Sequence, residues 1–364
     1  MKEITTIVDT YRQMEAEGES AALLTVVQVE GSSYRRIGAR MLVSETGRWV
    51  GGISGGCLEG DALRKAKHAI LQARPHIVTY DTREEEDRPI GIGLGCNGRI
   101  DVLISPLQAD KAHHLVNLLA AACCSRQAHV LVTVTDVAGA MDGITPGDTW
   151  LFDHTGLPDQ SLPPALTAVL SEAVAEVAQS GNSAYSTFEG FEALVEVLLP
   201  PIQVVMCGGN YDIAPFVDLT RLLGWRPIVV ANLQKVNPEY IANAETLHQL
   251  GQPLPAYDPR TAIVLMAHDY NTDLAYLRSA LETQSPYIAL LGPRKRALRM
   301  INMLAAEGLN MIAEHHRLYY PAGLDIGAAT PETIALSIAA EITAHFSGRQ
   351  GGLLRDRPGS IYSS

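Results

Sequence analysis

Residues 202–224 have the sequence IQVVMCGGNYDIAPFVDLTRLLG, and this stretch decides the fold class of the second half of the chain. The short apolar run 202–206 is typical of a buried strand, and the glycine-rich residues 207–210 then predict a sharp turn. The apolar residues that follow have helical spacing and end at Gly224. The segment therefore predicts a strand, a turn and a helix, which is the first part of a parallel βαβ arrangement.

The same alternation continues as far as residue 346. We expect further strands at 227–230, 262–267, 287–291 and 317–320, and helices at 239–250, 273–283, 294–307 and 332–346. The segment Thr330-Pro331-Glu332 favours the start of the last helix, because a threonine hydroxyl caps the first turn and proline suits its first position. This alternation predicts an α/β fold with a Rossmann-like, doubly wound parallel sheet.

The first 200 residues show a different pattern, which occurs twice. Residues 129–135 match 21–27, residues 149–156 (TWLFDHTG) match 40–47 (RMLVSETG), and residues 194–201 (LVEVLLPP) match 99–106 (RIDVLISP). We interpret these matches as an internal duplication of an α+β unit, although short strand–turn–strand strings also resemble one another by chance. The expected parts are an N-terminal unit, a degenerate second copy, a Rossmann-like domain and a C-terminal tail (1–107, 108–200, 201–350 and 351–364).

The composition excludes several classes of protein. Of the 364 residues, 47% are hydrophobic and 19% are charged, which is typical of a globular chain. The formal net charge of -12 disfavours nonspecific nucleic-acid binding, so an anionic ligand needs a local basic site. The 5 cysteines show no extracellular spacing, and no apolar run reaches the length of a membrane span. We therefore expect a cytoplasmic protein with reduced thiols and no membrane or nucleic-acid partner.

A cluster of arginines marks the first candidate site. Residues 31–40 (GSSYRRIGAR) place Arg35, Arg36 and Arg40 among small residues. Guanidinium groups bind phosphate or carboxylate through two parallel hydrogen bonds, and small residues leave backbone donors accessible. The segment therefore predicts an anion site, with an ordinary basic loop as the alternative.

Two cysteines follow in glycine-rich segments. Residues 51–61 (GGISGGCLEGD) place Gly55, Gly56 and Cys57 just before a predicted helix, where the helix dipole favours a thiolate. The alternative for Cys57 is a small buried hydrophobe, which is the commoner role of a free cysteine. Cys96 lies in a second glycine-rich stretch, which fits either a loop around a ligand or a flexible loop. The spacing of the two cysteines is not that of a zinc site.

The turn after the first strand of the Rossmann-like domain departs from the dinucleotide-binding pattern G-x-G-x-x-G. Asn210 takes the position of the second glycine and Ile213 that of the third, and the next strand ends at Asn232 without the acidic residue that binds a ribose. We therefore expect the fold without ordinary NAD binding. The alternative is an NAD(P)-dependent oxidoreductase with His268 or Asp269 near the site of hydride transfer.

Ligands of such folds bind at the carboxyl ends of the strands. Arg294 opens a helix directly after Gly292 and Pro293. Helix N-terminal amides with a basic side chain favour a phosphate, although an exposed basic turn is the alternative. The candidates at this edge are Cys207, Gly208, Gly209, Asn210, Asn232, His268, Asp269, Arg294, Lys295 and Asp325.

Several long motifs occur in an order that resembles the XdhC/CoxI family. They are GSSYRRIGARMLV, GGISGGCLEGD, GLGCNGRIDVLISPL, AIVLMAHDYNTDLAYL, YIALLGPRKR and GLDIGAATPETIALSIAAEI. The resemblance covers nearly the whole chain and implies an accessory factor that binds molybdenum cofactor and assists its sulfuration and insertion into a molybdenum hydroxylase such as xanthine dehydrogenase. It implies a cofactor chaperone rather than a catalyst. The partners it implies are the hydroxylase, a cysteine desulfurase and a second copy of the chain. The chain departs from the family pattern at Tyr34, where a proline is expected.

The resemblance also implies a site between the N-terminal loops and the carboxyl edge of the C-terminal sheet. Arg35, Arg36, Arg40 and Arg294 are expected to bind the phosphate of the molybdopterin. Cys57 and Cys96 are expected to contact the metal or relay sulfur, since molybdenum accepts soft sulfur ligands. The other expected cofactor-binding residues are Gly55, Gly56, Gly208, Gly209, Asn210 and His268.

Overall fold

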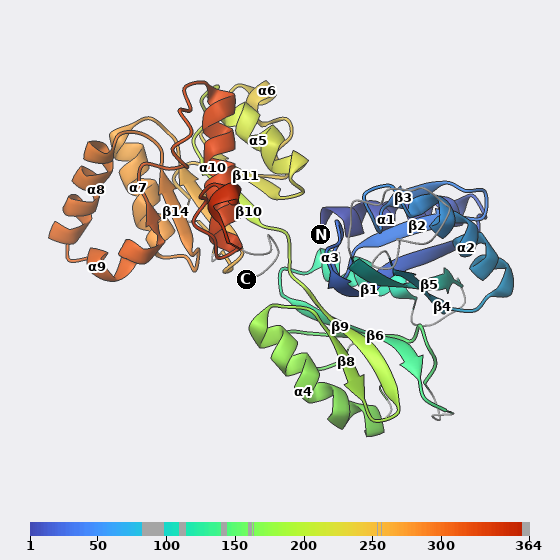
Figure 1. Cartoon of the computed structure of the whole chain (residues 1–364). Coiled ribbons are helices and arrows are strands. Elements are labelled where there is room, and N and C mark those ends of the chain that lie inside the picture. The colour runs from blue at the N-terminus through green and yellow to red at the C-terminus, as the bar shows by residue number, and fades with distance from the viewer. Residues whose placement is uncertain are drawn as a thin grey trace. The chain divides into compact units, whose positions relative to one another are not determined.

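A computed structural model describes residues 1–81, 98–108, 114–139, 144–158, 162, 164–252, 254–255 and 257–358. The chain divides into two compact units, Met1–Pro200 and Pro201–Ser364 (Figure 1). The first unit contains antiparallel sheets and the second a parallel sheet, which confirms the expected fold class. None of the helices in the described ranges is both long enough and apolar enough to cross a membrane.

The first sheet of unit 1 has five antiparallel strands in the order β3-β2-β1-β5-β4. The strands are β1 (Ala21–Gly31), β2 (Arg40–Ser44), β3 (Trp49–Gly51), β4 (His76–Asp81) and β5 (Gly98–Leu107). Helix α2 (Glu59–Gln72) packs on the face that carries Leu24, and α1 (Lys2–Ala16) and α3 (Leu115–Cys124) pack on the face that carries Leu23. Because alternate residues of a strand point to opposite faces, burial of both faces explains the unbroken apolar run of β1.

The second sheet of unit 1 repeats this architecture with four strands in the order β7-β6-β9-β8. The strands are β6 (His129–Val137), β7 (Thr149–Phe152), β8 (Ala184–Phe188) and β9 (Phe191–Leu198), and α4 (Pro164–Ser180) covers them. The order corresponds to β2-β1-β5-β4 of the first sheet. The central pair of each sheet shifts register at the same point, after Val26 in β1 and after Val134 in β6. These shared features agree with a duplication, and the finer boundary at 107/108 stays a prediction.

One of the three sequence matches has the wrong register. Ala21 pairs with Leu107, and its counterpart His129 pairs with Leu198, so Leu198 is the structural equivalent of Leu107. The match of 194–201 with 99–106 instead aligns Leu198 with Leu103, four residues away. Because four is an even number, the shift keeps every side chain on its own face, and the two strings look alike in either register.

The two sheets differ in the connection between their last two strands. β8 and β9 are joined by Glu189 and Gly190 alone, whereas residues 82–97 separate β4 from β5. Cys96 belongs to that longer connection and lies outside the described residues. The predicted roles of Cys96 therefore stay predictions.

Unit 2 contains a six-stranded sheet in the order β12-β11-β10-β13-β14-β15, and every neighbouring pair is parallel. The strands are β10 (Gln203–Cys207), β11 (Arg226–Ala231), β12 (Thr246–Gln249), β13 (Thr261–Leu265), β14 (Tyr287–Leu290) and β15 (Leu318–Tyr319). The helices are α5 (Ile213–Leu222), α6 (Pro238–Ile241), α7 (Tyr270–Leu281), α8 (Arg294–Ala306), α9 (Met311–Glu314) and α10 (Pro331–Phe346). This strand order is that of Rossmann folds, whose ligands bind where the order reverses, here between β10 and β13.

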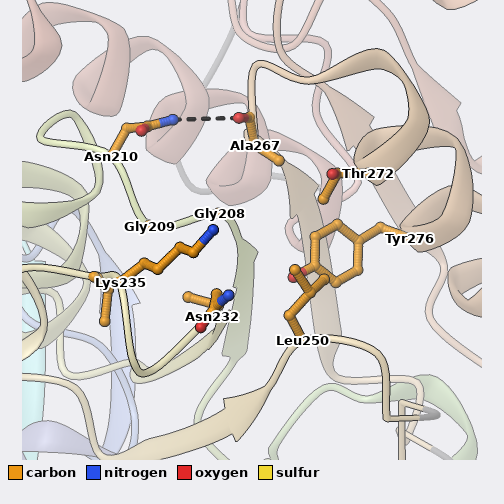
Figure 2. A pocket seen from close by; sticks show the side chains of 11 residues that line it. Gly208, Gly209, Asn210, Asn232, Lys235, Leu250, Ala267, Thr272 and Tyr276 are labelled. Carbon is orange, nitrogen blue, oxygen red and sulfur yellow. Dashed lines mark hydrogen bonds between the residues drawn. The ribbon is translucent and has the colours of Figure 1, made fainter.

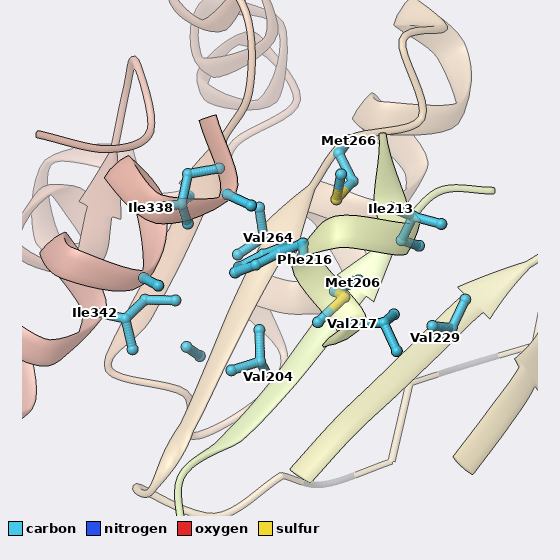
Figure 3. Close-up of a cluster of buried hydrophobic side chains, with 14 of the residues drawn as sticks. Val204, Met206, Ile213, Phe216, Val217, Val229, Val264, Met266, Ile338 and Ile342 are labelled. Atoms are coloured by element: carbon cyan, nitrogen blue, oxygen red, sulfur yellow. The ribbon is translucent and has the colours of Figure 1, made fainter. Parts of the chain in front are cut away.

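Helices cover both faces of the parallel sheet. On one face, Phe216 of α5 and Ile338 of α10 pack against Val204 and Val264 of the central strands (Figure 3). Helices α7 and α8 bury Leu277 and other side chains on the opposite face. The two layers hold the carboxyl ends of β10 and β13 in place.

The predicted helix at 239–250 is wrong. Only Pro238–Ile241 are helical, and Thr246–Gln249 form the edge strand β12. The segment is rich in alanine, glutamate and leucine, which favour a helix by intrinsic propensity. Hydrogen bonding to β11, with Ile228 opposite Thr246, overrides that propensity.

His114 makes the stability of unit 1 depend on pH. The buried imidazole lies between α1 and α3, with Nε2 3.1 Å from the hydroxyl of Tyr11, and Nδ1 has no partner among the described residues. Burial lowers the pKa of His114 below its usual value. The unfolded chain therefore takes up a proton at a higher pH than the folded chain, and stability falls as the pH drops below about 6.5 towards the folded-state pKa.

We expect the thermal midpoint of unit 1 to fall between pH 7.5 and 5.5, and to fall less in a His114→Gln variant. Differential scanning calorimetry at the two pH values measures this difference. The control is His68→Gln, which replaces an exposed histidine of α2. A pH dependence that is the same in His114→Gln and the unaltered chain would contradict the prediction.

Candidate functional site

The motif-bearing segments of unit 1 leave the same end of the first sheet. Gly31 at the end of β1 pairs with Gly98 at the start of β5, and the arginine loop (residues 32–39) follows β1. The cysteine loop (residues 52–58) begins at the same end, after β3. Both loops and the last residues of β4 therefore surround one end of the sheet.

A small cavity of about 20 Å³ lies between these segments. The ring of Tyr34 packs against Gly55, because a Cβ atom at Gly55 would lie 3.5 Å from Tyr34 Cγ. This contact joins the arginine loop to the cysteine loop, and it is made by the residue that departs from the expected proline. The lining residues are Ser32, Ser33, Tyr34, Ser54, Gly55, Cys57, Leu58, Tyr80, Gly98 and Ile100.

The cysteine loop is held by Glu59 and Ser54. The buried Glu59 carboxylate accepts hydrogen bonds from the Ser54 amide (2.9 Å), the Ser54 hydroxyl (2.5 Å) and the Leu58 amide (3.2 Å). Burial opposes ionisation of Glu59, but these hydrogen bonds outweigh it and hold the pKa of the carboxyl below its usual value. Ser54 Oγ also accepts hydrogen bonds from the amides of Gly56 and Leu58. Sequence reasoning missed Glu59, whose position in the first turn of a helix indicated only an effect on the dipole.

Cys57 is exposed, so the alternative of a small buried hydrophobe is wrong. Its thiol sulfur lies 3.5 Å from Ser54 Oγ. Cys57 directly precedes Leu58, which is the N-cap residue of α2. Among the described residues, no group of three or more His, Cys, Asp or Glu side chains is placed to hold a metal ion. Contact of Cys57 with molybdenum stays a prediction.

The three anion-binding arginines expected in unit 1 have different environments. Arg36 is exposed, and Arg35 forms an ion pair with Glu3 of α1. Arg40 is buried, and its guanidinium binds the carboxylate of Glu196 in β9, with Nη1 2.9 Å from Oε1. Because this ion pair occupies Arg40 and excludes it from solvent, the expectation that it binds a phosphate is wrong. The arginine instead joins the two sheets of unit 1.

In unit 2, an open cavity of about 190 Å³ lies at the carboxyl ends of the strands (Figure 2). It includes Gly208, Gly209, Asn210 and Asn232, as the sequence predicted for this edge, and also residues that the sequence analysis missed. His268 is exposed and directly follows the lining residue Ala267. The other lining residues are Ala231, Lys235, Val236, Leu250, Thr272 and Tyr276.

The glycines of this turn are needed for packing. A Cβ atom at Gly208 would lie 2.5 Å from the carbonyl oxygen of Met266, and one at Gly209 would lie 3.2 Å from Ala231 Cβ. Both glycines therefore let the turn fit against neighbouring strands, and their presence is not by itself evidence of a ligand. Asn210 anchors the turn, since its Nδ2 donates to the carbonyl oxygen of Ala267 at 3.2 Å.

Arg294 lies away from that cavity lining. It is exposed at the start of α8, with its guanidinium 5.8 Å from the ring centre of Tyr320. The expected anion site at Arg294 stays a prediction.

Comparison with known proteins gives matches in both units. Residues 204–342 match the model of the XdhC Rossmann domain, and residues 14–81 match that of the XdhC and CoxI family. The chain is 28% identical over 338 residues to a Bacillus subtilis protein named as a probable component of xanthine dehydrogenase, covering 89% of this chain and 92% of that protein. It is 24% identical over 328 residues to the Escherichia coli molybdenum cofactor insertion chaperone PaoD, covering 90% of this chain and 84% of that protein.

A solved structure shares the fold. A crystal structure described as a xanthine dehydrogenase from Bacillus halodurans matches with a TM-score of 0.71 at 24% identity. The match covers 94% of this chain and 96% of that one, so the fold of both units recurs there.

Proposed function

Because the chain belongs to the XdhC and CoxI family, we propose that it binds molybdenum cofactor, assists its sulfuration and delivers it to a molybdenum hydroxylase such as xanthine dehydrogenase. The name of PaoD, which aligns with 90% of this chain, supports a role in insertion of the cofactor. The structural observation that supports the proposal is the exposed thiol of Cys57. It lies on the cysteine loop, which is held by hydrogen bonds next to the arginine loop. The hydroxylase, a cysteine desulfurase and a second copy of the chain are the partners that we propose.

In this proposal the N-terminal loops hold the cofactor. Arg36, together with the part of Arg35 that Glu3 leaves exposed, attracts the terminal phosphate of the molybdopterin. The Cys57 thiol contacts the metal or receives sulfur. Gly55 and Gly56 place no side chain beside the Cys57 thiol. The hydrogen bonds of Glu59 and Ser54 hold the cysteine loop in place before a ligand binds.

No specific observation favours the alternative of an NAD(P)-dependent oxidoreductase. β11 ends at Ala231 and is followed by Asn232, where a dinucleotide-binding enzyme has the carboxylate for the ribose. We therefore propose that the chain is a chaperone for the cofactor and not an oxidoreductase.

Cofactor content tests the proposal. We expect the chain purified from a host that makes the cofactor to contain molybdenum and pterin in near-equal amounts to protein. A Cys57→Ala variant is expected to lose about tenfold or more of this content, because it removes a ligand to the metal while leaving the loop intact. Metal analysis and fluorescence of the oxidised pterin measure both components.

The matched control is Cys124→Ala, which removes an exposed cysteine at the end of α3. It is expected to leave the cofactor content unchanged. An unaltered chain that contains neither molybdenum nor pterin would contradict the proposed function, and equal contents in the two variants would contradict the role of Cys57 alone.

A further inference from the structure

The outer side of α8 is an exposed face that combines basic and apolar side chains. Helix α8 lies at the outside of unit 2 (Figure 1) and buries Ala297, Met300 and Leu304 against the sheet. Exposed residues with helical spacing form its opposite side, the α8 face: Lys295, Leu298, Arg299, Asn302 and Met303. A helix that covers a sheet usually exposes polar side chains on its other side, so the apolar residues of this face need an explanation.

The α8 face is basic although the chain is acidic. The helix sequence RKRALRMINMLAA contains several basic residues and no acidic residue, whereas the chain has a formal net charge of -12. The dipole of a helix disfavours a cation in its first turn, so the charge of Lys295 does not stabilise α8. Local stability therefore does not account for the positive charge of this face.

The charge of the α8 face is not neutralised within the described ranges. The acidic side chains of the neighbouring segments already bind other partners: Asp273 binds Arg296, Glu307 binds Arg278 and Glu314 binds Arg317. Lys295 and Arg299 form no ion pair with an acidic residue in the part of the chain that the structure describes. Both cations are therefore available to the carboxylates of another molecule.

Arg299 is oriented before any partner binds. Its guanidinium lies 4.9 Å from the ring centre of Tyr270 in α7. The aromatic ring attracts the guanidinium without removing its charge. A side chain that is already ordered loses less conformational entropy on binding, so this contact favours an ion pair with a partner. Arginine and methionine, which occur here as Arg299 and Met303, are both enriched in protein interfaces.

The chemistry of the α8 face favours an acidic protein surface over two other partners. A second copy of the chain, bound through this face around a twofold axis, would bring like charges together. A helix that binds a membrane surface needs a large apolar face, but Leu298 and Met303 are only 41% and 43% exposed, and α8 contains no aromatic residue. A partner protein with carboxylates around an apolar contact fits both the charge and the small apolar area.

We propose that the α8 face docks an acidic surface of the molybdenum hydroxylase. Carboxylates of the hydroxylase pair with Lys295 and Arg299, and an apolar side chain between them packs on Leu298 and Met303. The identity of the partner rests on the proposed function, and the inference adds the surface through which this chain binds it. Neither basic residue lines the cavity of unit 1 or that of unit 2, so docking leaves both cavities open.

Isothermal titration calorimetry tests the docking, with the full chain and a bacterial xanthine dehydrogenase purified without its cofactor. We expect Lys295→Glu/Arg299→Glu to weaken binding about tenfold or more at about 50 mM salt, because it replaces two attractions by repulsions. The loss is expected to be smaller at about 200 mM salt, since salt screens exposed charges. Leu298→Ser is expected to weaken binding several-fold at both salt concentrations, because an apolar contact is not screened.

The matched control is Arg12→Glu/Lys67→Glu, which makes the same change of net charge at exposed residues of α1 and α2. We expect this variant to bind the hydroxylase as tightly as the unaltered chain does. An equal loss of affinity in the two double variants would overturn the α8 face, because the loss would then come from the net charge. Thermal unfolding of each variant checks that the fold is retained.

Cofactor content separates this inference from the proposed function. We expect Lys295→Glu/Arg299→Glu to contain as much molybdenum and pterin as the unaltered chain. If the unaltered chain contains the cofactor but binds the hydroxylase no better than this variant does, the α8 face is overturned and the cofactor role stands. An unaltered chain with neither cofactor nor affinity for the hydroxylase contradicts both proposals.

Two further measurements test the choice of partner. Sedimentation velocity shows whether the unaltered chain associates with itself, and flotation with phosphatidylglycerol vesicles shows whether it binds a membrane. We expect Lys295→Glu/Arg299→Glu to leave both results unchanged. Self-association or vesicle binding that is lost in this variant would overturn the hydroxylase as the partner of the α8 face.

Discussion

Replacing Arg40 by methionine is expected to lower the free energy of unfolding of unit 1 by about 3–5 kcal/mol. Arg40 is 1% exposed, and Glu196 is 6% exposed. Arg40 Nη1 donates to both Glu196 Oε1 and the carbonyl oxygen of Gly38, each at 2.9 Å. Removal of the guanidinium leaves the Glu196 carboxylate buried without its counter-charge, which is the costly outcome for a buried ion pair. Chemical denaturation of the full chain, followed by tryptophan fluorescence, measures the loss.

The double variant Arg40→Met/Glu196→Leu separates the unpaired charge from the packing. We expect it to recover most of the lost stability, because an apolar pair of similar volume replaces a buried ion pair at little cost. Arg48→Met, which breaks the exposed pair with Glu17, is the matched control and is expected to change the midpoint little. A double variant no more stable than the single one would contradict the explanation.

Replacing Gly51 by alanine is also expected to have a large effect and to lower the free energy of unfolding by about 2–5 kcal/mol. Gly51 has a φ of 80°, and a Cβ atom there would overlap the carbonyl oxygen of Arg40. The variant therefore adds a steric clash between β2 and β3 to a left-handed backbone. Since the cysteine loop begins at the next residue, we also expect a lower cofactor content.

Gly56→Ala is the control for the backbone contribution. Gly56 also has a positive φ, of 112°, but no atom lies within 4 Å of an added Cβ. Its substitution is expected to cost only the conformational strain, about 1–2 kcal/mol. Thermal unfolding of the two variants compares them, and equal losses would show that the overlap at Gly51 relaxes without cost.

The sequence predicted unit 2 well because its signals are local. Each strand of the central sheet is a short apolar run, and the last helix has its own start signal, the capping box at Thr330. The failure at 246–249 occurred where the deciding interaction is with another strand. Four residues at a sheet edge are too few to show an alternation.

The candidate sites were less predictable because their chemistry depends on distant partners. The sequence alone predicts Arg40 as an anion ligand, because its partner Glu196 lies 156 positions away. Asp212 and His268 are 56 positions apart, and only the fold shows that the carboxylate serves the imidazole rather than the helix. Glycine clusters in the sequence predicted the positions of both candidate sites. At Gly208, however, glycine is required because the turn lies against the carbonyl oxygen of Met266.

The two-residue turn of the second sheet has a practical meaning for laboratory evolution. Glu189 and Gly190 close the hairpin of β8 and β9, so an architecture of this kind does not need the longer connection 82–97 for closure. We therefore expect a library randomised across 82–97 to retain the first sheet, so that loss of function among its members reports on those residues and not on misfolding. The second sheet thus shows that a connection of two residues is enough to join the last two strands of this architecture.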